Sequence, residues 1–265
     1  METIRIKNIE DGIVTVMLSR PERKNAMSVQ MMDDIIEAGE TLIAREDIRA
    51  VILNGAGDSF CAGIDLDDLM KFAGNLDLAK EMMATALGDH GANKFQRPTT
   101  IWRDLRVPVI AALSGNCLGA GAQLALGADI RIAKDDLSFS IMEAKWGLIP
   151  DMGISQSLPR LIPADRALAL IMTGTKLDAQ RALNYGLVTE VCSDPYARAM
   201  ELAREIVTMS PDAVAASKQM VNALWFNPKD GLKLEATLQQ SLIGKPNQIE
   251  KTMASMQKRP PNFDT

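Results

Sequence analysis

Histidine is nearly absent from this chain, because His90 is the single one in 265 residues. Zinc sites and Ser-His or Cys-His nucleophile pairs need imidazoles that are clustered or partnered. His90 lies in an irregular stretch with several glycines, where a surface position is the expected one. No Gly-x-Ser-x-Gly motif occurs either. We therefore expect neither a metal centre nor a histidine-dependent hydrolase.

Cysteine is also scarce, and the three cysteines are Cys61, Cys117 and Cys192. They lie far apart among small or apolar neighbours and show no paired spacing. Such a distribution is typical of reduced core thiols and not of a disulfide framework. The cysteine usage predicts a cytoplasmic protein.

Long apolar runs are missing, since none approaches the roughly 18 residues that a transmembrane helix needs. The N-terminus alternates polar and apolar residues and lacks the apolar core of a signal peptide. The net charge of −5 disfavours nucleic acid as a partner. With 47% hydrophobic residues, the chain can fill a large core. We expect a soluble globular protein that is not bound to a membrane.

Strand and helix signals follow each other along the chain. A β-hairpin is predicted at 4–6 and 13–18, and Ser28 is a candidate N-cap for a helix at 29–45. Further strands are expected at 50–53, 107–113 and 187–191, and further helices at 163–172, 178–186, 197–208, 211–225, 231–243 and 246–257. Residues 72–100 are the least regular part, and we expect them to form a mobile segment over a ligand.

The most informative stretch runs from Ser114 to Leu158. A strand is predicted just before it, and residues 123–129 have helical character, so Gly119-Ala120-Gly121 forms a strand-to-helix turn. The first N–H groups of a helix have no partner within the helix and lie at its positive dipole end. Glycine allows another group to approach the backbone closely. An electron-rich group is therefore expected at this turn.

That group has two candidates. Residues 115–121 fit the G-x-x-x-G-x-G spacing of short-chain nicotinamide dehydrogenases, which would place a phosphate here. Such enzymes carry the motif after their first strand and have a Lys four residues after a catalytic Tyr. Here Tyr185 and Tyr196 are followed by Thr189 and Met200 at that spacing, which disfavours a dehydrogenase. The second candidate is a developing oxyanion. Alternatively, these glycines bind no group and only allow the helix to pack tightly.

Several ordered segments of the chain resemble the crotonase (enoyl-CoA hydratase/isomerase) family. They read FCAGIDL at 60–66, LSGNCLGAG at 113–121, FSIME at 139–143 and GLIPDMG at 147–153. In motif the chain is most similar to the dienoyl-CoA isomerases of that family. The resemblance implies an α/β fold, a crotonase-type spiral of repeated β-β-α units. It further implies a core domain at 1–193 and a C-terminal helical region at 194–265 that forms trimers or hexamers.

The same resemblance assigns candidate roles around an acyl-CoA thioester. The backbone N–H groups of Ile64 and Ala120 would form an oxyanion hole for the thioester carbonyl, with Gly119 and Gln123 in support. The expected CoA-binding residues are Arg23, Lys24, Ala62, Asp65 and Lys258, and the expected acyl pocket contains Leu69, Met70 and Trp146. CoA is part of the substrate, so no separate cofactor is expected.

Two carboxylates are the candidate acid/base groups. Glu143 and Asp151 flank a loop containing Gly147 and Pro150, which can bring both side chains to one cavity. Hydratases of the family have glutamates at the positions of Gln123 and Glu143, and an amide cannot exchange protons at neutral pH. The context of Asp151 resembles the isomerases of the family. Double-bond migration is therefore favoured over hydration by Glu143, and an acyl-CoA-binding protein without turnover remains the alternative of another class.

Overall fold

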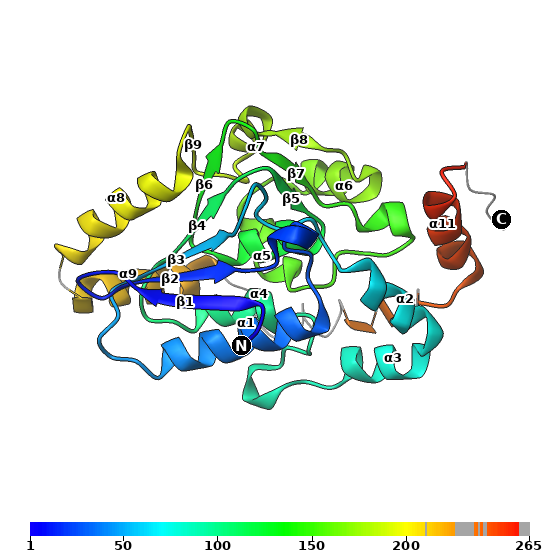
Figure 1. Cartoon of the computed structure of the whole chain (residues 1–265), viewed down its shortest axis with the longest axis horizontal. Helices are drawn as coiled ribbons and strands as arrows, with labels where there is room; N and C mark the ends of the chain where they lie inside the picture. The colour runs from blue at the N-terminus through cyan, green and yellow to red at the C-terminus, as the bar shows by residue number, and fades with distance from the viewer. Residues whose placement is uncertain (210, 226–235, 238, 241–242, 260–265) are drawn as a thin grey trace.

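Two β-sheets of different size organise this computed structural model, which describes residues 1–209, 211–225, 236–237, 239–240 and 243–259 (Figure 1). The larger sheet has the order β1-β2-β3-β4-β6-β9, and the smaller one has the order β5-β7-β8. The strands of the larger sheet are β1 (Ile4–Asn8), β2 (Ile13–Leu18), β3 (Ala50–Gly55), β4 (Val109–Leu113), β6 (Ile130–Lys134) and β9 (Glu190–Cys192). Those of the smaller sheet are β5 (Asn116–Leu118), β7 (Ser138–Ser140) and β8 (Leu177–Asp178).

The chain passes repeatedly from the large sheet to the small one and then into a helix. β4 leads to β5 and to helix α5 (Ala120–Gly127), and β6 leads to β7. In the preceding repeat, Cys61 pairs with Cys117 of β5 shortly before helix α2 (Leu66–Gly74). The repeated β-β-α arrangement predicted from the sequence is therefore confirmed.

The N-terminal elements form as their sequence predicts. β1 and β2 pair antiparallel, and Asp11 and Gly12 take φ values of +50° and +78° in the turn between them. Helix α1 (Val29–Ile43) begins after Ser28, whose Oγ accepts a hydrogen bond from the Met31 N–H at 3.1 Å. This N-cap is the predicted one, and the helix ends two residues before the predicted position, within the usual variation of helix ends.

Both faces of the large sheet are covered. Alternate strand residues point to opposite faces, so Val51 and Leu53 pack in the core that includes α1, whereas Ile52 packs against Ala199 and Met200 of helix α8 (Pro195–Val207). Figure 1 shows α8 and α1 on opposite sides of this sheet. The loops that follow its strands are therefore held by a sheet that is packed on both sides.

The segment 72–100 is more regular than expected. It contains helix α3 (Leu76–Ala84) and the short helix α4 (Arg97–Thr100). The Asn93 side chain donates to the Met83 carbonyl at 2.7 Å, and Arg97, only 3% exposed, pairs with Asp104 at 2.6 Å. Buried polar contacts of this kind hold the segment to the core, so the prediction of an irregular segment was wrong. His90 lies on the surface, as predicted, with 51% of its side chain exposed.

The later helices are α6 (Ala164–Thr173), α7 (Ala179–Tyr185), α9 (Pro211–Trp225) and α11 (Pro246–Met256), at or near their predicted positions. Asp178 caps α7 and Gly186 ends it at φ +81°, both as expected. The expected strand at 187–191 is β9, which begins at residue 190. The helix expected at 231–243 lies largely outside the described residues. The side chains of Leu224, Trp225, Phe226, Leu238 and Leu242, apolar residues of the C-terminal region that is predicted to form trimers or hexamers, also lie outside the described residues.

The domain boundary at 193/194 stays a prediction, and the residues after it are tied closely to the core. α8 packs directly on the large sheet, and α11 contacts the short helix η4 (Glu143–Trp146). Ser255 Oγ donates to the Lys145 carbonyl at 2.6 Å and Thr252 Oγ1 to that of Trp146 at 2.9 Å. Of the helices in the described ranges, none has both the length and the apolar character needed to cross a bilayer.

Candidate active site

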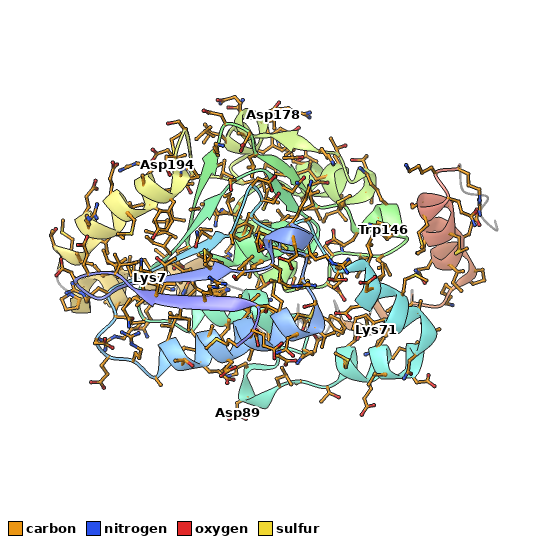
Figure 2. The ribbon with its side chains drawn as sticks, viewed as in Figure 1. Lys7, Lys71, Asp89, Trp146, Asp178 and Asp194 are labelled. Atoms are coloured by element: carbon orange, nitrogen blue, oxygen red, sulfur yellow. The ribbon has the colours of Figure 1, made fainter. Side chains whose placement is uncertain are left out.

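A cavity of about 380 Å³ lies at the N-terminal end of helix α5. Its walls come from the loop before α2, from α2 itself, from η4 with the loop that follows it, and from the C-terminal part of the chain. Most of the lining side chains are apolar, and a few polar groups converge among them, as in most small-molecule sites. Trp146, a lining residue labelled in Figure 2, lies towards the end of the molecule where α11 is found.

The predicted oxyanion donors, Ile64 and Ala120, both line this cavity. Ala120 is the first residue of α5, so its N–H has no acceptor within the helix. Ile64 lies opposite Met27 in a parallel bridge whose hydrogen bonds are made by the Gly63 carbonyl and the Asp65 N–H. That bridge leaves the Ile64 N–H unused. The structure thus brings two backbone donors from distant segments to one cavity.

Glycines make this arrangement possible. Gly63 and Gly119 have φ values of +108° and +51°, a region that other residues rarely adopt. At Gly121, an added Cβ would lie 2.4 Å from the Cys61 carbonyl oxygen, so the close approach of α5 to the segment before α2 requires glycine. The distance between the two donor segments is therefore set by residues without side chains.

Glu143 and Gln123 form the polar centre of the site. Gln123, only 1% exposed, donates from Nε2 to Glu143 Oε1 at 2.8 Å. Glu143 Oε2 is shielded from solvent and has no hydrogen-bond partner among the described residues. Burial raises the pKa of Glu143 to about 7, and the hydrogen bond from Gln123 only partly opposes that rise. A carboxyl group with this pKa can both release and accept a proton near neutral pH.

Asp151 lines the same cavity on the loop that follows η4. The neighbouring Met152 N–H donates to Gln123 Oε1 at 2.9 Å. Gln123 therefore contacts Glu143 through its NH₂ group and the Asp151 loop through its carbonyl oxygen. The two predicted acid/base residues and the amide thus line one cavity, and their roles stay a prediction.

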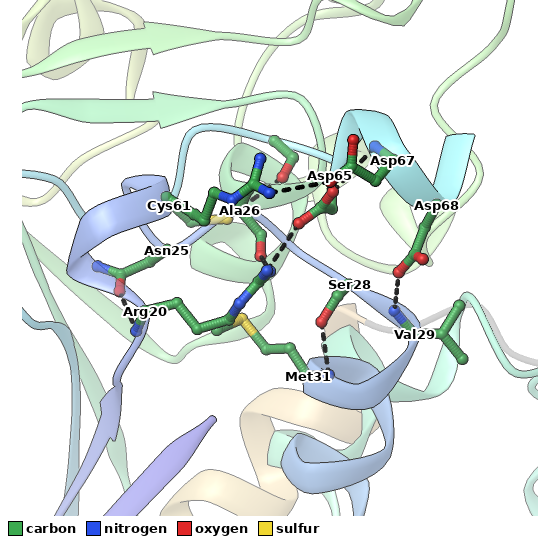
Figure 3. Close-up of polar contacts among 12 residues, drawn as sticks. Arg20, Asn25, Ala26, Ser28, Val29, Met31, Cys61, Asp65, Asp67 and Asp68 are labelled. Carbon is green, nitrogen blue, oxygen red and sulfur yellow. Dashed lines mark hydrogen bonds and ion pairs between the residues drawn. The ribbon is translucent and has the colours of Figure 1, made fainter. Parts of the chain in front are cut away.

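The predicted CoA-binding residues separate into two groups. Arg23, Ala62 and Asp65 line the cavity, whereas Lys24 and Lys258 are not among its lining residues. The Asp65 carboxylate is engaged inside the protein, since it pairs with Arg20 at 2.8 Å and accepts from the Asp67 N–H at the start of α2 (Figure 3). Asp65 thus holds the loop that carries Ile64.

Arg20 ties this loop to the segment before α1. Besides pairing with Asp65, it donates from Nη1 to the Ala26 carbonyl at 2.6 Å, and its backbone N–H donates to Asn25 Oδ1 at 2.9 Å (Figure 3). Arg23, further along the same segment, pairs with Asp67 at 2.9 Å on the surface. The rim of the cavity is therefore fixed by charged contacts between two loops.

Two of the three predicted acyl-pocket residues, Leu69 and Trp146, line the cavity, but Met70 does not. Met70 is 51% exposed, because it follows Leu69 on α2 and neighbouring helical residues point about 100° apart. Phe95, Gln239 and Ile243 were missed. Phe95 packs edge to face on Phe72 with ring centroids 5.5 Å apart, and Gln239 accepts from the Ile149 N–H at 3.3 Å. These contacts join residues far apart in sequence, and no local pattern marks them.

Among the described residues, no group of three or more histidine, cysteine, aspartate or glutamate side chains could hold a metal ion. Cys61 and Cys117 are free and fully buried, and burial raises the pKa of both thiols. They lie opposite each other beneath the donor segments, where they act as small packing residues. Cys192 is half-buried and free.

Comparisons with known proteins agree with this geometry. The family model described as enoyl-CoA hydratase/isomerase matches residues 8–265, and the chain belongs to this family. It is 32% identical to the mitochondrial Delta(3,5)-Delta(2,4)-dienoyl-CoA isomerase of Mus musculus, over 97% of this chain and 80% of that protein. It is 34% identical to the 1,2-epoxyphenylacetyl-CoA isomerase of Escherichia coli (strain K12), over 97% of both chains.

Solved structures show the same fold. The crystal structure of an enoyl-CoA hydratase from Bacillus anthracis superposes with a TM-score of 0.76 at 30% sequence identity, covering 98% of each chain. The crotonase fold expected from the sequence is therefore confirmed. Both isomerase and hydratase names occur among the relatives, so family membership supports an acyl-CoA enzyme without deciding between the two reactions.

Proposed function

We propose that this protein moves a double bond in an unsaturated acyl-CoA, with Asp151 and Glu143 transferring the proton. The supporting observation is the composition of the polar centre. A hydratase of this family would have a second glutamate where Gln123 lies, but here an amide holds Glu143 and the Asp151 loop in place. An amide cannot exchange a proton at neutral pH, and the Asp65 carboxylate at the same cavity is paired with Arg20, so Asp151 is the second candidate for proton transfer.

The proposed reaction begins at the thioester carbonyl. One carboxylate removes a proton from a saturated carbon that lies next to the carbonyl or next to a double bond conjugated with it, and the electron pair moves onto the carbonyl oxygen to give an enolate. The backbone N–H groups of Ile64 and Ala120 stabilise this oxygen, and losing one such donor in other enzymes costs about 3–4 kcal/mol. The proton then returns to a different carbon, and the double bond is displaced without any change in composition.

The protonation of Glu143 suits this exchange. With a pKa of about 7, Glu143 is divided between its protonated and ionised forms at neutral pH. Protonated Glu143 can therefore donate a proton to one carbon of the substrate when Asp151 removes a proton from another carbon. Proton transfer of this kind needs neither a metal ion nor a redox cofactor, so we propose that CoA is present only as part of the substrate.

Binding of the CoA group is assigned to Arg23, Ala62 and Asp65 at the rim of the cavity, with Lys24 and Lys258 as further candidates. The apolar lining, which includes Leu69 and Trp146, would hold the acyl chain. We further propose that the chain assembles as a trimer or a dimer of trimers. A cytoplasmic location and the absence of nucleic-acid partners remain predictions from the sequence.

Hydration by Glu143 is the alternative reaction. The raised pKa of Glu143 is the observation that supports this alternative, because a carboxyl group that is partly ionised at neutral pH can also activate water. An acyl-CoA-binding protein without turnover is the alternative of another class.

Incubation with a panel of enoyl- and dienoyl-CoA thioesters in deuterated water distinguishes the three hypotheses: isomerisation, hydration and binding without turnover. Isomerisation places deuterium at the carbon that the double bond has left, without adding oxygen. Hydration adds the mass of one heavy-water molecule. A panel in which every thioester binds but none changes would exclude both reactions and leave the binding protein.

A further inference from the structure

A buried amide forms part of the otherwise mostly apolar wall of the proposed acyl site. Gln239 lines the cavity of about 380 Å³, and only 3% of this residue is exposed. The Ile243 N–H donates to the Gln239 carbonyl at 3.0 Å, and Ile243 lines the same cavity. Residues four apart on a helical turn lie on one face, so this face of the C-terminal segment borders the cavity.

The segment that carries Gln239 is also anchored to helix α3. Gln240 Nε2 donates to the Lys80 carbonyl at 3.3 Å, and a Cβ added to Gly244 would lie 2.8 Å from Cδ1 of Leu76. The two neighbouring glutamines therefore have different surroundings. Gln239 borders the cavity, whereas Gln240 is bonded to α3 and is not among the lining residues.

The two ends of the Gln239 amide can be told apart. The Ile149 N–H donates to Oε1 at 3.3 Å, and only the oxygen of an amide side chain can accept such a bond. Among the described residues, none accepts a hydrogen bond from Nε2. Nε2 is not one of the solvent-shielded polar atoms that lack a partner, so it reaches open space. The open space that Gln239 borders is the cavity.

Other polar side chains around the cavity are already engaged. Asp65 pairs with Arg20 at 2.8 Å, and Arg23 pairs with Asp67 at 2.9 Å. Gln123 is hydrogen-bonded at both ends of its amide. The two carboxylates proposed for proton transfer act at the reacting carbons. The NH₂ group described above is therefore a side-chain donor that the acyl group of a ligand can use.

A plain hydrocarbon chain does not suit this donor. It would displace water from Nε2 and offer no acceptor in return, and a buried donor without a partner is costly. A site with such a group discriminates against ligands that leave it unpaired. An oxygen atom on the acyl group would remove this cost, because it can accept the hydrogen bond.

The charges around the cavity restrict that oxygen to a neutral group. Of the described residues in the lining, Arg23 is the only one with a cationic side chain, and it is paired at the rim. Glu143 and Asp151 line the same cavity, and an ionised carboxylate on the acyl group would be repelled by them. A ketone, hydroxyl or ether oxygen accepts from an amide without this repulsion.

We propose that the acyl group of the substrate carries a neutral oxygen and that Gln239 Nε2 donates a hydrogen bond to it. This inference rests on the proposed function, because it takes the cavity as the site of the acyl group. Ile149, which fixes the amide, lies two residues before Asp151, and two residues span at most about 7 Å. The hydrogen bond therefore belongs to the wall of the cavity from which Asp151 is proposed to reach the acyl carbons.

Saturated thioesters test this preference without any reaction, because they have no double bond to move or to hydrate. Calorimetric titration of the full chain compares hexanoyl-CoA with oxo derivatives that carry a ketone on successive carbons of the outer half of the chain. At one position the ketone should tighten binding by roughly three- to tenfold, the usual effect of one hydrogen bond. The monothioester of adipic acid, which ends in a carboxylate, should bind more weakly than hexanoyl-CoA.

Gln239→Met tests the donor, and Gln240→Met is the matched control. Gln239→Met keeps the length of the side chain but removes its N–H groups, so the preference for the ketone over the hydrocarbon should disappear. Gln240→Met makes the same exchange at the neighbouring residue, which is bonded to α3, and should keep the preference. Comparing the two thioesters within each variant cancels a general weakening of binding that follows from loss of the contact with Ile149.

Equal binding of hexanoyl-CoA and all of its oxo derivatives by the unaltered protein would overturn the proposal, and this result needs no variant to fold. A ketone preference that persists in Gln239→Met would overturn the role of Gln239. Isomerisation in deuterated water without a ketone preference contradicts this inference alone. A ketone preference without turnover contradicts the isomerase alone, and a protein that binds none of the thioesters contradicts both.

Discussion

In the proposed mechanism, single carboxyl groups decide which reaction the site performs. Asp151→Asn keeps the size and most hydrogen-bonding capacity of the side chain but removes its basic oxygen. We expect isomerase turnover to fall by roughly 100- to 10,000-fold, the range for a lost acid/base group, with little change in CoA-thioester affinity. Discontinuous rate assays over a range of concentrations of the best thioester of the panel measure the turnover and the affinity for that thioester.

The matched variant is Glu143→Gln. If the two carboxylates serve different carbons, Glu143→Gln will be as damaging as Asp151→Asn, and if Asp151 acts alone, it will be much milder. Hydration predicts the opposite ranking, with Glu143 indispensable. Full isomerase activity in a folded Asp151→Asn protein would eliminate the proposed mechanism.

The buried carboxyl of Glu143 also links stability to pH. Its pKa rises from 4.5 in the unfolded chain to about 7 in the folded protein, so the folded state binds more protons between these values. The stabilising effect of the protonated form is fully present below pH 4.5 and is lost as pH rises through 7. The shift corresponds to at most about 3 kcal/mol. Denaturant unfolding of Glu143→Gln against the unaltered protein should show a flatter stability profile between pH 5 and 7. Parallel profiles would show that Glu143 titrates normally.

Helix α5 is the element on which the proposed oxyanion hole depends. Ala120→Pro removes one donor, and proline is tolerated in the first position of a helix, so the fold should persist. Turnover should fall by about 100- to 1,000-fold, as when one oxyanion donor is lost elsewhere. Ala120→Gly retains the N–H and is the control. Circular dichroism establishes that the variant is folded, and an active Ala120→Pro protein would remove Ala120 from the proposed hole.

The contact between α5 and the segment before α2 gives a second test. A Cβ at Gly121 would lie 2.4 Å from the Cys61 carbonyl oxygen and 2.7 Å from the Cys61 Cβ, so Gly121→Ala must push the two donor segments apart. We expect a loss of roughly 1–3 kcal/mol in unfolding free energy, the usual cost of overpacking. Gly74→Ala is the comparison, because its Cβ would meet nothing within 4 Å. Equal unfolding midpoints for the two variants would count against this close contact.

Elements with local signals were predictable from the sequence, and contacts between distant elements were not. The cap at Ser28, the turn at Gly12 and the start of α5 at Gly119 depend on neighbouring residues, and all three are found where expected. Helix α3 was missed because the glycines and charges around it resemble a loop. Gln239 reaches the cavity only through tertiary packing, which the hydrophobic periodicity of the sequence does not predict. Met70 was misplaced because hydrophobicity alone does not say which face of α2 a residue occupies.

At the scale of the whole molecule, we propose assembly on the basis of exposed apolar side chains. Leu168 and Met172 on α6 are 51% and 69% exposed, and Met253 and Met256 on α11 are 43% and 50% exposed. Apolar residues gathered on helix surfaces are typical of contacts between copies. Light scattering at micromolar concentration should give a trimer or hexamer, and Met172→Lys should lower that mass while Lys176→Met does not. A monomer mass would refute the prediction.

The proposed oxyanion donors are main-chain groups, and this has a consequence for how the chemistry of the family can diversify. A substitution at Gln123, Glu143 or Asp151 changes the supply of protons, but the N–H groups of Ile64 and Ala120 persist through almost any exchange of side chains. Activation of the thioester and choice of reaction can therefore be inherited separately. One scaffold could pass between isomerisation and hydration by exchanging a few carboxyl and amide groups, and relatives of both names lie at similar distances from this chain.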